Sequence, residues 1–340
     1  MSYLAATALN EYRHQYANSS LDRFENRGTG LGLLSLAKRD TPNLISASTL
    51  IAARGTAERV TKVPVLQRIT FVPGSTRSCT GATQSSTSAL QTVSWSTVTS
   101  GFHMVPSLYL NNEIAYVEDF KHKMQQMELS IAKQMDSAVY TKLNTVKSTT
   151  FTATDAPFAF ASSVIQVPQS YKSTYLSELY QSLYQDDYNG PFNIIASPGL
   201  MPVNQFYANQ GSSNATNTVY QFGDFNFDYS NRVTLSGGAV ATFFVMPSGS
   251  IAILDWVDPD SRAGMRISES NYWTTTTLPM IGVNCGLHYQ ATCGDNTTEG
   301  GAGLEASYIE NFNFSFDYAL ITPYISTGAS PIFKADLLSL

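Results

Sequence analysis

Cysteine, histidine and charged residues are all scarce in this 340-residue sequence. The three cysteines, Cys79, Cys285 and Cys293, form no C-x-x-C pair of the kind that binds zinc, and their odd number leaves at least one thiol unpaired. We expect all three to be free thiols. No run reaches the roughly 18 consecutive apolar residues of a membrane helix, and the first residues form neither a charged leader nor an apolar signal core. The sequence therefore predicts a soluble protein made in a cytoplasm, with no membrane partner.

Motifs of known catalytic and cofactor sites are also missing. There is no H-E-x-x-H, no G-x-x-x-x-G-K-[ST] and no G-x-S-x-G. The four histidines are far apart: His14, His103, His122 and His288. Gly28, Gly30 and Gly32 have neither the spacing nor the preceding apolar strand of a dinucleotide loop. The sequence therefore predicts no catalytic, cofactor-binding or metal-binding residues, and no enzyme activity.

One acidic cluster allows a different interpretation. Asp255, Asp258 and Asp260 lie within six residues and offer oxygen atoms of the kind that calcium binds. The cluster does not match a D-x-[DN]-x-[DN]-G loop, and Asp258 directly precedes a proline. We interpret it as a turn after a strand, with Arg262 near enough to pair. A hydrolase that uses Asp255 or Asp258 stays as a minor alternative.

Charge is unevenly distributed along the chain. Residues 1–77 hold ten Lys or Arg and five Asp or Glu, whereas residues 148–340 hold five and sixteen. A mildly basic N-terminal segment on an acidic body does not favour sequence-specific nucleic-acid binding, which needs a dense basic face. The basic segment is open to three interpretations: it lies near a polyanion, docks on an acidic neighbour, or is simply solvated.

The residues that are abundant indicate a β-rich protein with broad contact surfaces. Hydrophobic residues make up 43% of the chain, enough for a sizeable core, while charged residues make up only 14%. Soluble domains typically have roughly 25% charged residues. Tyr, Phe, Ser, Thr and Asn occupy the surface instead, which suits proteins that meet their neighbours over polar and aromatic surfaces.

The clearest single element is a long helix over residues 111–147. Its apolar residues recur every three or four positions and neither Gly nor Pro interrupts it. These residues are Val117, Phe120, Met124, Met127, Ile131, Met135, Val139, Leu143 and Val146. At 1.5 Å per residue, the helix would be roughly 55 Å long, about twice the diameter of a small domain.

The other elements are predicted from shorter patterns. Residues 1–57 indicate an extended arm with one short helix near residues 4–16, and residues 59–106 indicate one long β-hairpin with a turn-rich, uncharged centre. A helix over 169–188, a buried strand in PFNIIAS and a third helix that Ser197 caps form a compact α/β unit. Two apolar strands then flank the turn at 247–249, and SYIENFNFSFDYALI alternates aromatic and polar residues as a last strand.

This order of elements resembles the major capsid proteins of tailed bacteriophages, which have the Hong Kong 97-type fold. The most specific part is the sequence from LNNEIAYVEDFKHKMQQMELSIAKQMDSAVYTKLN to SELYQSLY and FNIIASPGLMPVNQF, a spine helix followed by helix, strand and helix. The resemblance implies an α+β fold with these parts: an N-terminal arm (1–57), an E-loop hairpin (58–106), a P domain with the spine helix (107–159), an A domain (160–304), and P-domain return strands with a C-terminal tail (305–340).

The resemblance also implies what the protein does and with what it assembles. The expected function is a coat protein that forms hexamers and pentamers of itself in an icosahedral or prolate head, located in the virion after assembly in the bacterial cytoplasm. It implies a separate scaffolding protein, a portal, and packaged double-stranded DNA held by non-specific proximity. The alternative is a β-rich virion decoration protein or adhesin that binds glycan through aromatic residues such as Trp256 and Trp273.

Overall fold

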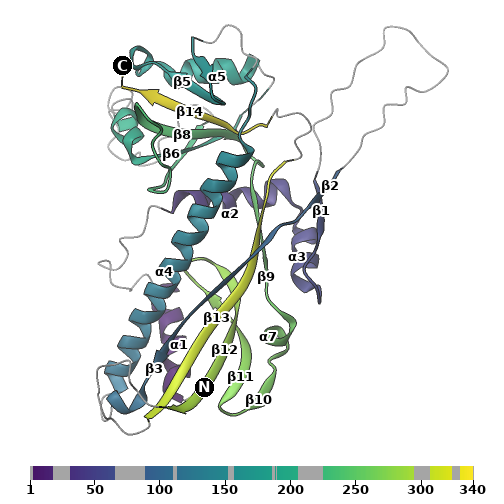
Figure 1. The fold of residues 1–340 in the computed structure, drawn as a ribbon, viewed down its shortest axis with the longest axis vertical. Coiled ribbons are helices and arrows are strands. Elements are labelled where there is room, and N and C mark those ends of the chain that lie inside the picture. The colour runs from purple at the N-terminus through teal and green to yellow at the C-terminus, as the bar shows by residue number, and fades with distance from the viewer. Residues whose placement is uncertain are drawn as a thin grey trace, which may run out of the picture.

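A computed structural model gives the fold of this chain (Figure 1). It describes residues 3–17, 31–65, 89–109, 113–151, 157–185, 188, 190–205, 225–294, 307–323 and 330–339. The centre of the expected hairpin, residues 66–88, lies outside the described residues, as does Cys79. Helices and strands are mixed, and the strands form three separate sheets, so the fold is α+β as expected. No described helix is both long and apolar enough to cross a membrane.

The larger end of the molecule is built on one six-stranded sheet, which we call the β13 sheet. Its order is β10-β11-β12-β13-β3, and β9 also pairs with β13. The strands are β3 (Trp95–Met104), β9 (Ala252–Trp256), β10 (Arg266–Ser268), β11 (Asn271–Leu278), β12 (Val283–Gly294) and β13 (Ser307–Ile321). The strand expected in SYIENFNFSFDYALI is thus confirmed as β13. It is 15 residues long and pairs antiparallel with β12, β3 and β9.

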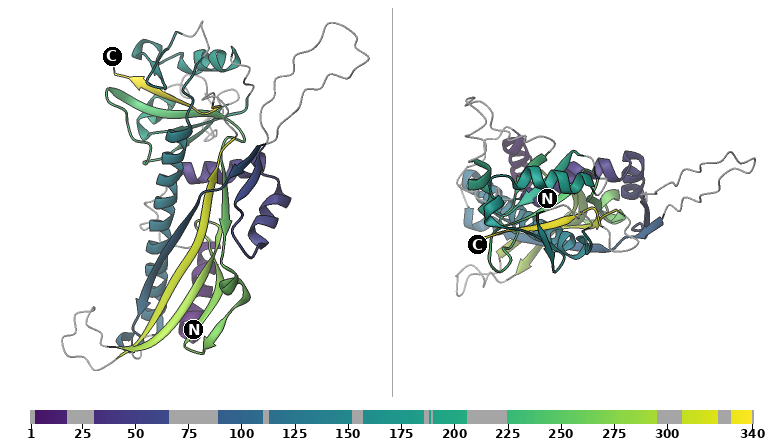
Figure 2. Two further views of the ribbon diagram at one scale, coloured as in Figure 1. Left: turned by 45° about the vertical axis from the view of Figure 1, so that its right-hand side comes forward. Right: turned by 90° about the horizontal axis from the view of Figure 1, so that it is seen from above.

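The other end contains a second six-stranded sheet, which we call the β8 sheet. Its order is β4-β5-β14-β8-β6-β7. The strands are β4 (Ala159–Ala161), β5 (Val164–Val167), β6 (Phe192–Ala196), β7 (Phe225–Tyr229), β8 (Ala239–Pro247) and β14 (Phe333–Leu338). Helix α5 (Tyr175–Gln185), the turns η2 (Gln169–Tyr171) and η3 (Pro198–Leu200), and a helical segment over residues 201–205 also belong to this end. Figure 2 shows the two sheets stacked along the long axis of the molecule.

Helix α4 (Glu113–Val146) runs from beside the β13 sheet up to the β8 sheet (Figure 1). The helix expected over 111–147 is therefore confirmed. Its apolar side is buried along the whole length, from Phe120 and Met124 through Met135 to Leu143. The first half of this face belongs to the core under the β13 sheet and the second half to the core under β6 and β8. The length of the helix is what spans both cores.

The expectation of an extended N-terminal arm is wrong for the described residues. Three helices occupy this region: α1 (Tyr3–Ala17), α2 (Gly32–Leu44) and α3 (Ala47–Gly55). The short helix near residues 4–16 is confirmed as α1, and it packs along α4. In α2, Leu33, Leu34, Leu36 and Ala37 are buried in the cores that α4 lines. Burial of this apolar face, rather than the local sequence, makes the segment helical.

Of the hairpin expected over 58–106, the described residues include the base. Strands β1 (Lys62–Val65) and β2 (Ala89–Thr92) pair antiparallel, with Lys62 opposite Thr92 and Val65 opposite Ala89. The following strand β3 leaves this ribbon and pairs with β13 instead. The turn η1 (Pro106–Tyr109) then leads into α4. Residues 95–104 are therefore part of the β13 sheet and not the second arm of a long hairpin.

The observed sheets also divide the chain differently from the expected ranges 160–304 and 305–340. Strands β9 to β12 lie within the first range but belong to the β13 sheet, and β14 lies within the second but belongs to the β8 sheet. Strands β8 and β9 are both apolar and flank the turn at 247–249, as expected. They do not pair with each other, because β8 pairs with β6 and β14 while β9 pairs with β13.

The expected helix–strand–helix unit is confirmed, and its third helix begins with η3 and continues as α-helix over residues 201–205. Helix α5 buries Tyr175, Leu176, Leu179 and Leu183, and all five residues of β6 are buried. Ser197 does precede a helical turn, η3, but its side chain does not cap it. The Ser197 hydroxyl accepts a hydrogen bond from the backbone N–H of Thr242 at 3.1 Å instead. Ser197 thus ties η3 to β8.

Candidate functional site

The base of the hairpin is held firmly on one face and open on the other. Val63 and Val65 are both 1% exposed and pack with Ile45, β9 and the end of β13. The indole N–H of Trp95 donates to the Val60 carbonyl at 2.8 Å, which fixes the chain where β3 begins. On the outward face Leu90 is 61% exposed. Among the described strands β1 and β2 pair only with each other, so both outer edges of this ribbon keep unpaired backbone groups.

Basic residues near the N-terminus pair with acidic residues of the same chain. Arg39 contacts Asp228 at 2.6 Å, Arg59 contacts Asp317 at 3.4 Å, and the Arg54 Nε donates to Asp255 Oδ1 at 2.9 Å. The three arginine side chains are about half exposed, so each pair contributes little to stability alone. None of the three interpretations of the basic segment foresaw this arrangement, because the acidic partners of these arginines lie within the chain itself.

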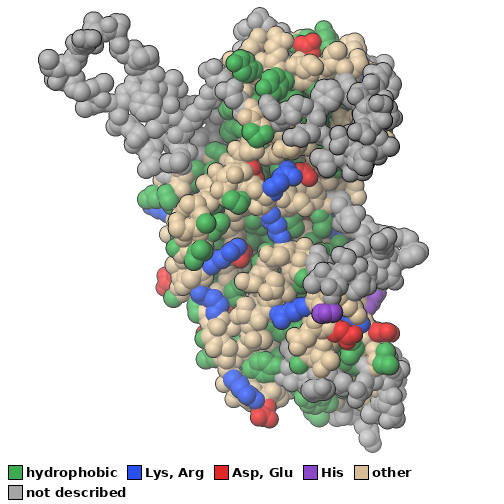
Figure 3. Space-filling model, turned by 180° about the vertical axis from the view of Figure 1, so that it is seen from behind, with side chains coloured by type: hydrophobic (Ala, Val, Ile, Leu, Met, Phe, Trp, Pro, Cys, Tyr) green, Lys and Arg blue, Asp and Glu red, His purple; other side chains and the backbone are tan. Residues whose placement is uncertain are grey.

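Lys and Arg side chains do not gather into one patch on the face drawn in Figure 3. They are spread along the length of the described surface and alternate with acidic and neutral residues. The described part of this face therefore has no dense basic surface of the kind that sequence-specific nucleic-acid binding requires.

Two buried carboxylates of α4 hold the N-terminal helices. Glu128 is 0% exposed and accepts hydrogen bonds from the Tyr12 hydroxyl of α1 at 2.7 Å and from the Ile281 N–H at 3.0 Å. Asp136, also 0% exposed, accepts from the Leu34 N–H of α2 at 2.8 Å and from the Ser230 hydroxyl at 2.5 Å. Burial raises the pKa of both carboxyl groups, and the hydrogen bonds oppose this only in part.

A third buried carboxylate joins α2 to the connection between the two sheets. Asp40 is 1% exposed, and its oxygens accept the backbone N–H groups of Gly249 at 2.7 Å, Ser250 at 2.8 Å and Ile251 at 3.3 Å. These residues form the link from β8 to β9. None of the three carboxylates was predicted from the sequence to be buried. The one available signal was that Glu128 and Asp136 directly follow apolar residues of the long helix, Met127 and Met135, and so lie beside its buried face.

The acidic cluster at 255–260 separates into unrelated structural roles. Asp255 pairs with Arg54, and Asp258 caps the short helix α7 (Pro259–Ala263) by accepting from the Ser261 N–H at 2.9 Å. Arg262 does not pair with Asp258 as expected. It donates to the carbonyls of Arg54 and Thr56 and lies 5.7 Å from the Trp256 ring centre. Within the described ranges, no three His, Cys, Asp or Glu side chains come together as metal ligands would.

The remaining sequence candidates are also separate. Cys285 is buried and free, Cys293 is exposed and free, and burial raises the pKa of the Cys285 thiol. His288 stacks on Trp273 with ring centres 4.3 Å apart, and its Nε2 lies 2.8 Å from Asn271 Oδ1. Trp256 and Trp273 lie in different strands, β9 and β11, and share no ring contact.

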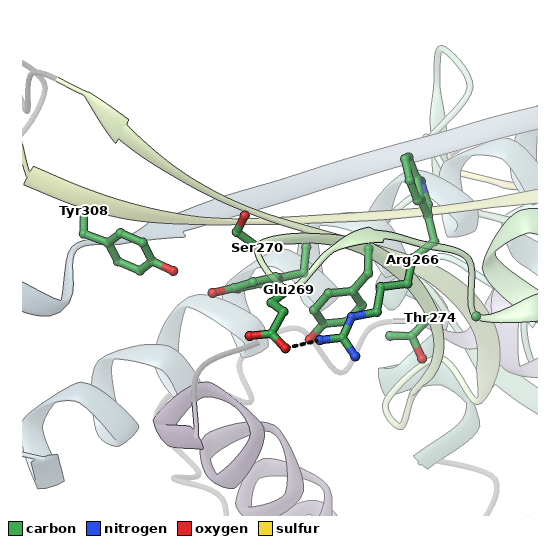
Figure 4. Close-up of a pocket in the computed structure, with 9 residues that line it drawn as sticks. Arg266, Glu269, Ser270, Thr274 and Tyr308 are labelled. Carbon is green, nitrogen blue, oxygen red and sulfur yellow. Dashed lines mark ion pairs between the residues drawn. The ribbon is translucent and has the colours of Figure 1, made fainter.

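A cleft of about 600 Å³ lies at the outer end of the β13 sheet. Figure 4 shows Tyr308 on one side and Arg266, Glu269 and Thr274 on the other. Tyr272 and Tyr289 also line it, with ring centres 5.2 Å apart. Arg266 and Glu269 pair at 3.2 Å on its rim. No sequence motif marks this cleft, because strands β10 to β13 bring its residues together.

Comparison with known proteins gives matches in structure alone. No family model and no curated protein matches the sequence. A chain from Mycobacterium phage Che8 is similar over 86% of this chain and 89% of its own, with a TM-score of 0.47 and 10% identity. A chain from Gordonia phage Cozz covers 91% and 87% with a TM-score of 0.44 and 13% identity. A chain of the holo-SrpI encapsulin complex from Synechococcus elongatus PCC 7942 covers 73% and 75%, with a TM-score of 0.38 and 11% identity. At these values the likeness alone does not define a family.

Proposed function

We propose that this chain is the major capsid protein of a tailed bacteriophage and assembles with copies of itself into a closed shell. In this proposal the β13 sheet with α4 corresponds to the P domain, the β8 sheet with α5 to the A domain, and the β1–β2 ribbon to the base of the E loop. The subunits form hexamers and pentamers of an icosahedral or prolate head that encloses double-stranded DNA, and the mature protein is part of the virion.

The observation that carries the proposal is the β1–β2 ribbon. Its inner face is fixed in the core of its own chain by Val63 and Val65, while its outer edges and Leu90 have no partner among the described residues. A two-stranded ribbon of this kind is marginal alone and gains stability when another chain covers it. Copies of the same chain are the simplest partner, because repeated contacts between identical subunits close into rings.

The further partners follow from the same proposal. DNA would be held by proximity, because residues 148–340 carry eleven more acidic than basic residues and three N-terminal arginines are already paired. A separate scaffolding protein and a portal would direct the closure of the head. The proposal includes no enzyme activity, since Asp255 and Asp258 both have structural partners.

The test is the assembly state of the purified full-length chain at moderate salt. Light scattering followed by negative-stain electron microscopy should show hollow shells, or rings of five and six subunits. A chain that stays monomeric on its own should assemble when it is co-expressed with the neighbouring phage genes. A monomer or trimer under both conditions would contradict the proposal and favour the decoration protein or adhesin.

A further inference from the structure

The cleft at the end of the β13 sheet combines aromatic rings with hydroxyl groups. Tyr272 of β11 and Tyr308 of β13 contribute rings that are half-buried and 46% exposed, respectively. Ser270 and Thr274 contribute hydroxyl groups from the β10–β11 side. The volume of about 600 Å³ lies within the range of roughly 300–1,000 Å³ that is typical of small-molecule sites.

The wall behind these rings is rigid. Tyr289 is 1% exposed, and its hydroxyl donates to the Glu310 carboxylate at 2.7 Å. Glu310 is 0% exposed and also accepts from the Tyr116 hydroxyl of α4 at 2.6 Å. The Tyr289 side chain therefore cannot leave its place without breaking a buried charge-assisted hydrogen bond. Its ring packs against that of Tyr272 with the ring planes at 39°.

The charges at the cleft balance. Arg266 and Glu269 are the only charged residues of the described lining, and they pair with each other at 3.2 Å. Their side chains are 61% and 95% exposed, so both can turn toward a ligand at little cost in solvation. A strongly anionic or cationic ligand would find no excess of opposite charge here.

We propose that this cleft binds a neutral carbohydrate, a mono- or disaccharide unit of a larger glycan. A sugar ring presents C–H groups on one face and hydroxyls around its edge. Its apolar face matches the rings of Tyr272 and Tyr308. Its hydroxyls match the donors and acceptors of Ser270, Thr274 and the Arg266–Glu269 pair. The inference does not rest on the proposed function, since it is argued from the residues of a single subunit.

A peptide is the competing occupant, because proline-rich segments also bind grooves lined by aromatic residues. The composition favours the sugar. The two hydroxyl side chains and the balanced ion pair give the cleft several hydrogen-bonding groups. A proline residue has no backbone N–H and can bond to them only through its backbone carbonyl, whereas a sugar has several hydroxyls.

The test is isothermal titration of the full-length protein at neutral pH with four neutral disaccharides: maltose, cellobiose, lactose and di-N-acetylchitobiose. At least one should bind, and Tyr308→Ala should weaken its binding tenfold or more. Glu269→Ala, at a side chain that is 95% exposed and carries no fold contact beyond Arg266, should weaken it at least threefold. Tyr184→Ala is the matched control, because Tyr184 is a 61% exposed tyrosine of α5 outside the cleft lining. The affinity of this variant for the sugar should stay within twofold of that of wild type.

Three outcomes would overturn the inference. The first is that none of the four sugars binds. The second is that a sugar binds equally well to wild type, Tyr308→Ala and Glu269→Ala. The third is that a hexaproline peptide binds in place of the sugars and loses affinity on Tyr308→Ala, which would assign the cleft to a peptide. Far-UV circular dichroism of each variant shows that the fold is intact, and Glu269→Ala keeps the test valid if Tyr308→Ala misfolds.

Discussion

At the scale of single residues, the buried carboxylate of Glu128 makes stability depend on pH. Burial raises its pKa, so the folded state holds the proton more tightly than the unfolded state. The stability it contributes is complete below the ordinary carboxyl pKa and is lost as pH rises through the raised value. Glu128→Gln cannot ionise and should escape this loss. Its stability relative to wild type, measured by urea unfolding over a pH series, should therefore increase as pH rises above the ordinary carboxyl pKa.

The control for this measurement is Glu269→Gln, whose side chain is 95% exposed. Because its ion pair with Arg266 is exposed, the substitution should change the unfolding free energy by less than about 1 kcal/mol. Tyr12 of α1 and Lys38 of α2 both lower the pKa of Glu128 and so reduce the difference between Glu128→Gln and wild type, but burial is the larger effect. A Glu128→Gln variant whose stability ran parallel to wild type across the range would show that the carboxyl does not titrate as described.

Asp40 is the residue whose loss should cost most in the connection between the sheets. Its carboxylate accepts three backbone N–H groups of residues 249–251, and Asp40→Ala would leave those of Ser250 and Ile251 buried without this acceptor. We expect a loss of about 3 kcal/mol in the free energy of unfolding. Asp260→Ala, at an exposed position of α7, should change it by less than about 1 kcal/mol in the same urea titration. Equal losses in the two variants would contradict the role of Asp40.

At the scale of elements, periodicity predicted individual helices and strands but not their partners. The long helix, α5, β6 and β13 were all predicted correctly, because the apolar residues that each element buries recur in its own sequence at helical or strand spacing. The apolar strands β8 and β9 look like a hairpin in sequence, yet they pair into different sheets. Which strand lies beside which depends on contacts that are distant in sequence, and for the same reason the cleft of β10 to β13 was not predicted.

Helix α2 was missed because its local sequence argues against a helix. It contains Pro42, begins at Gly32 and has no side-chain cap at its N-terminus. Gly32 is needed because a Cβ there would overlap the Tyr229 carbonyl oxygen of β7. The close approach of α2 to the β8 sheet therefore explains both the glycine and the helix. From the sequence alone, Gly32 indicated a flexible segment, because the contact with Tyr229 is distant in sequence.

The contact at Gly32 predicts a large effect from a small substitution. Gly32→Ala should force α2 away from β7 and reduce the free energy of unfolding by about 2 kcal/mol or more. Gly55→Ala, at the end of α3, is the matched control, because a Cβ there meets nothing within 4 Å. We expect it to stay within about 0.5 kcal/mol of wild type. Hydrogen exchange of residues 33–44 should rise in the first variant only, and equal protection in both would contradict the packing.

At the scale of the whole molecule, α2 and α4 connect two sheets that share no strand. Asp136 joins α4 to α2, Asp40 joins α2 to the β8–β9 connection, and Glu128 joins α4 to α1. Each link is a buried carboxylate bonded to a hydroxyl or to backbone N–H groups. The two ends of the molecule are therefore fixed relative to each other from within. A subunit of this kind presents surface features such as the β1–β2 ribbon in one defined direction.

That fixed direction makes Leu90 the most informative surface position for assembly. It is 61% exposed on the outward face of the ribbon, opposite Pro64, and contributes nothing to the core of its own chain. In a closed shell every subunit would repeat the same contact, so a small loss at each one accumulates over the particle. Leu90→Asp should leave the circular dichroism spectrum and unfolding midpoint unchanged, yet reduce the shell fraction in light scattering at least tenfold. Leu90→Val keeps an apolar side chain in the strand and should assemble as wild type does. Wild-type yields of shells from Leu90→Asp would exclude the ribbon face from the subunit contacts.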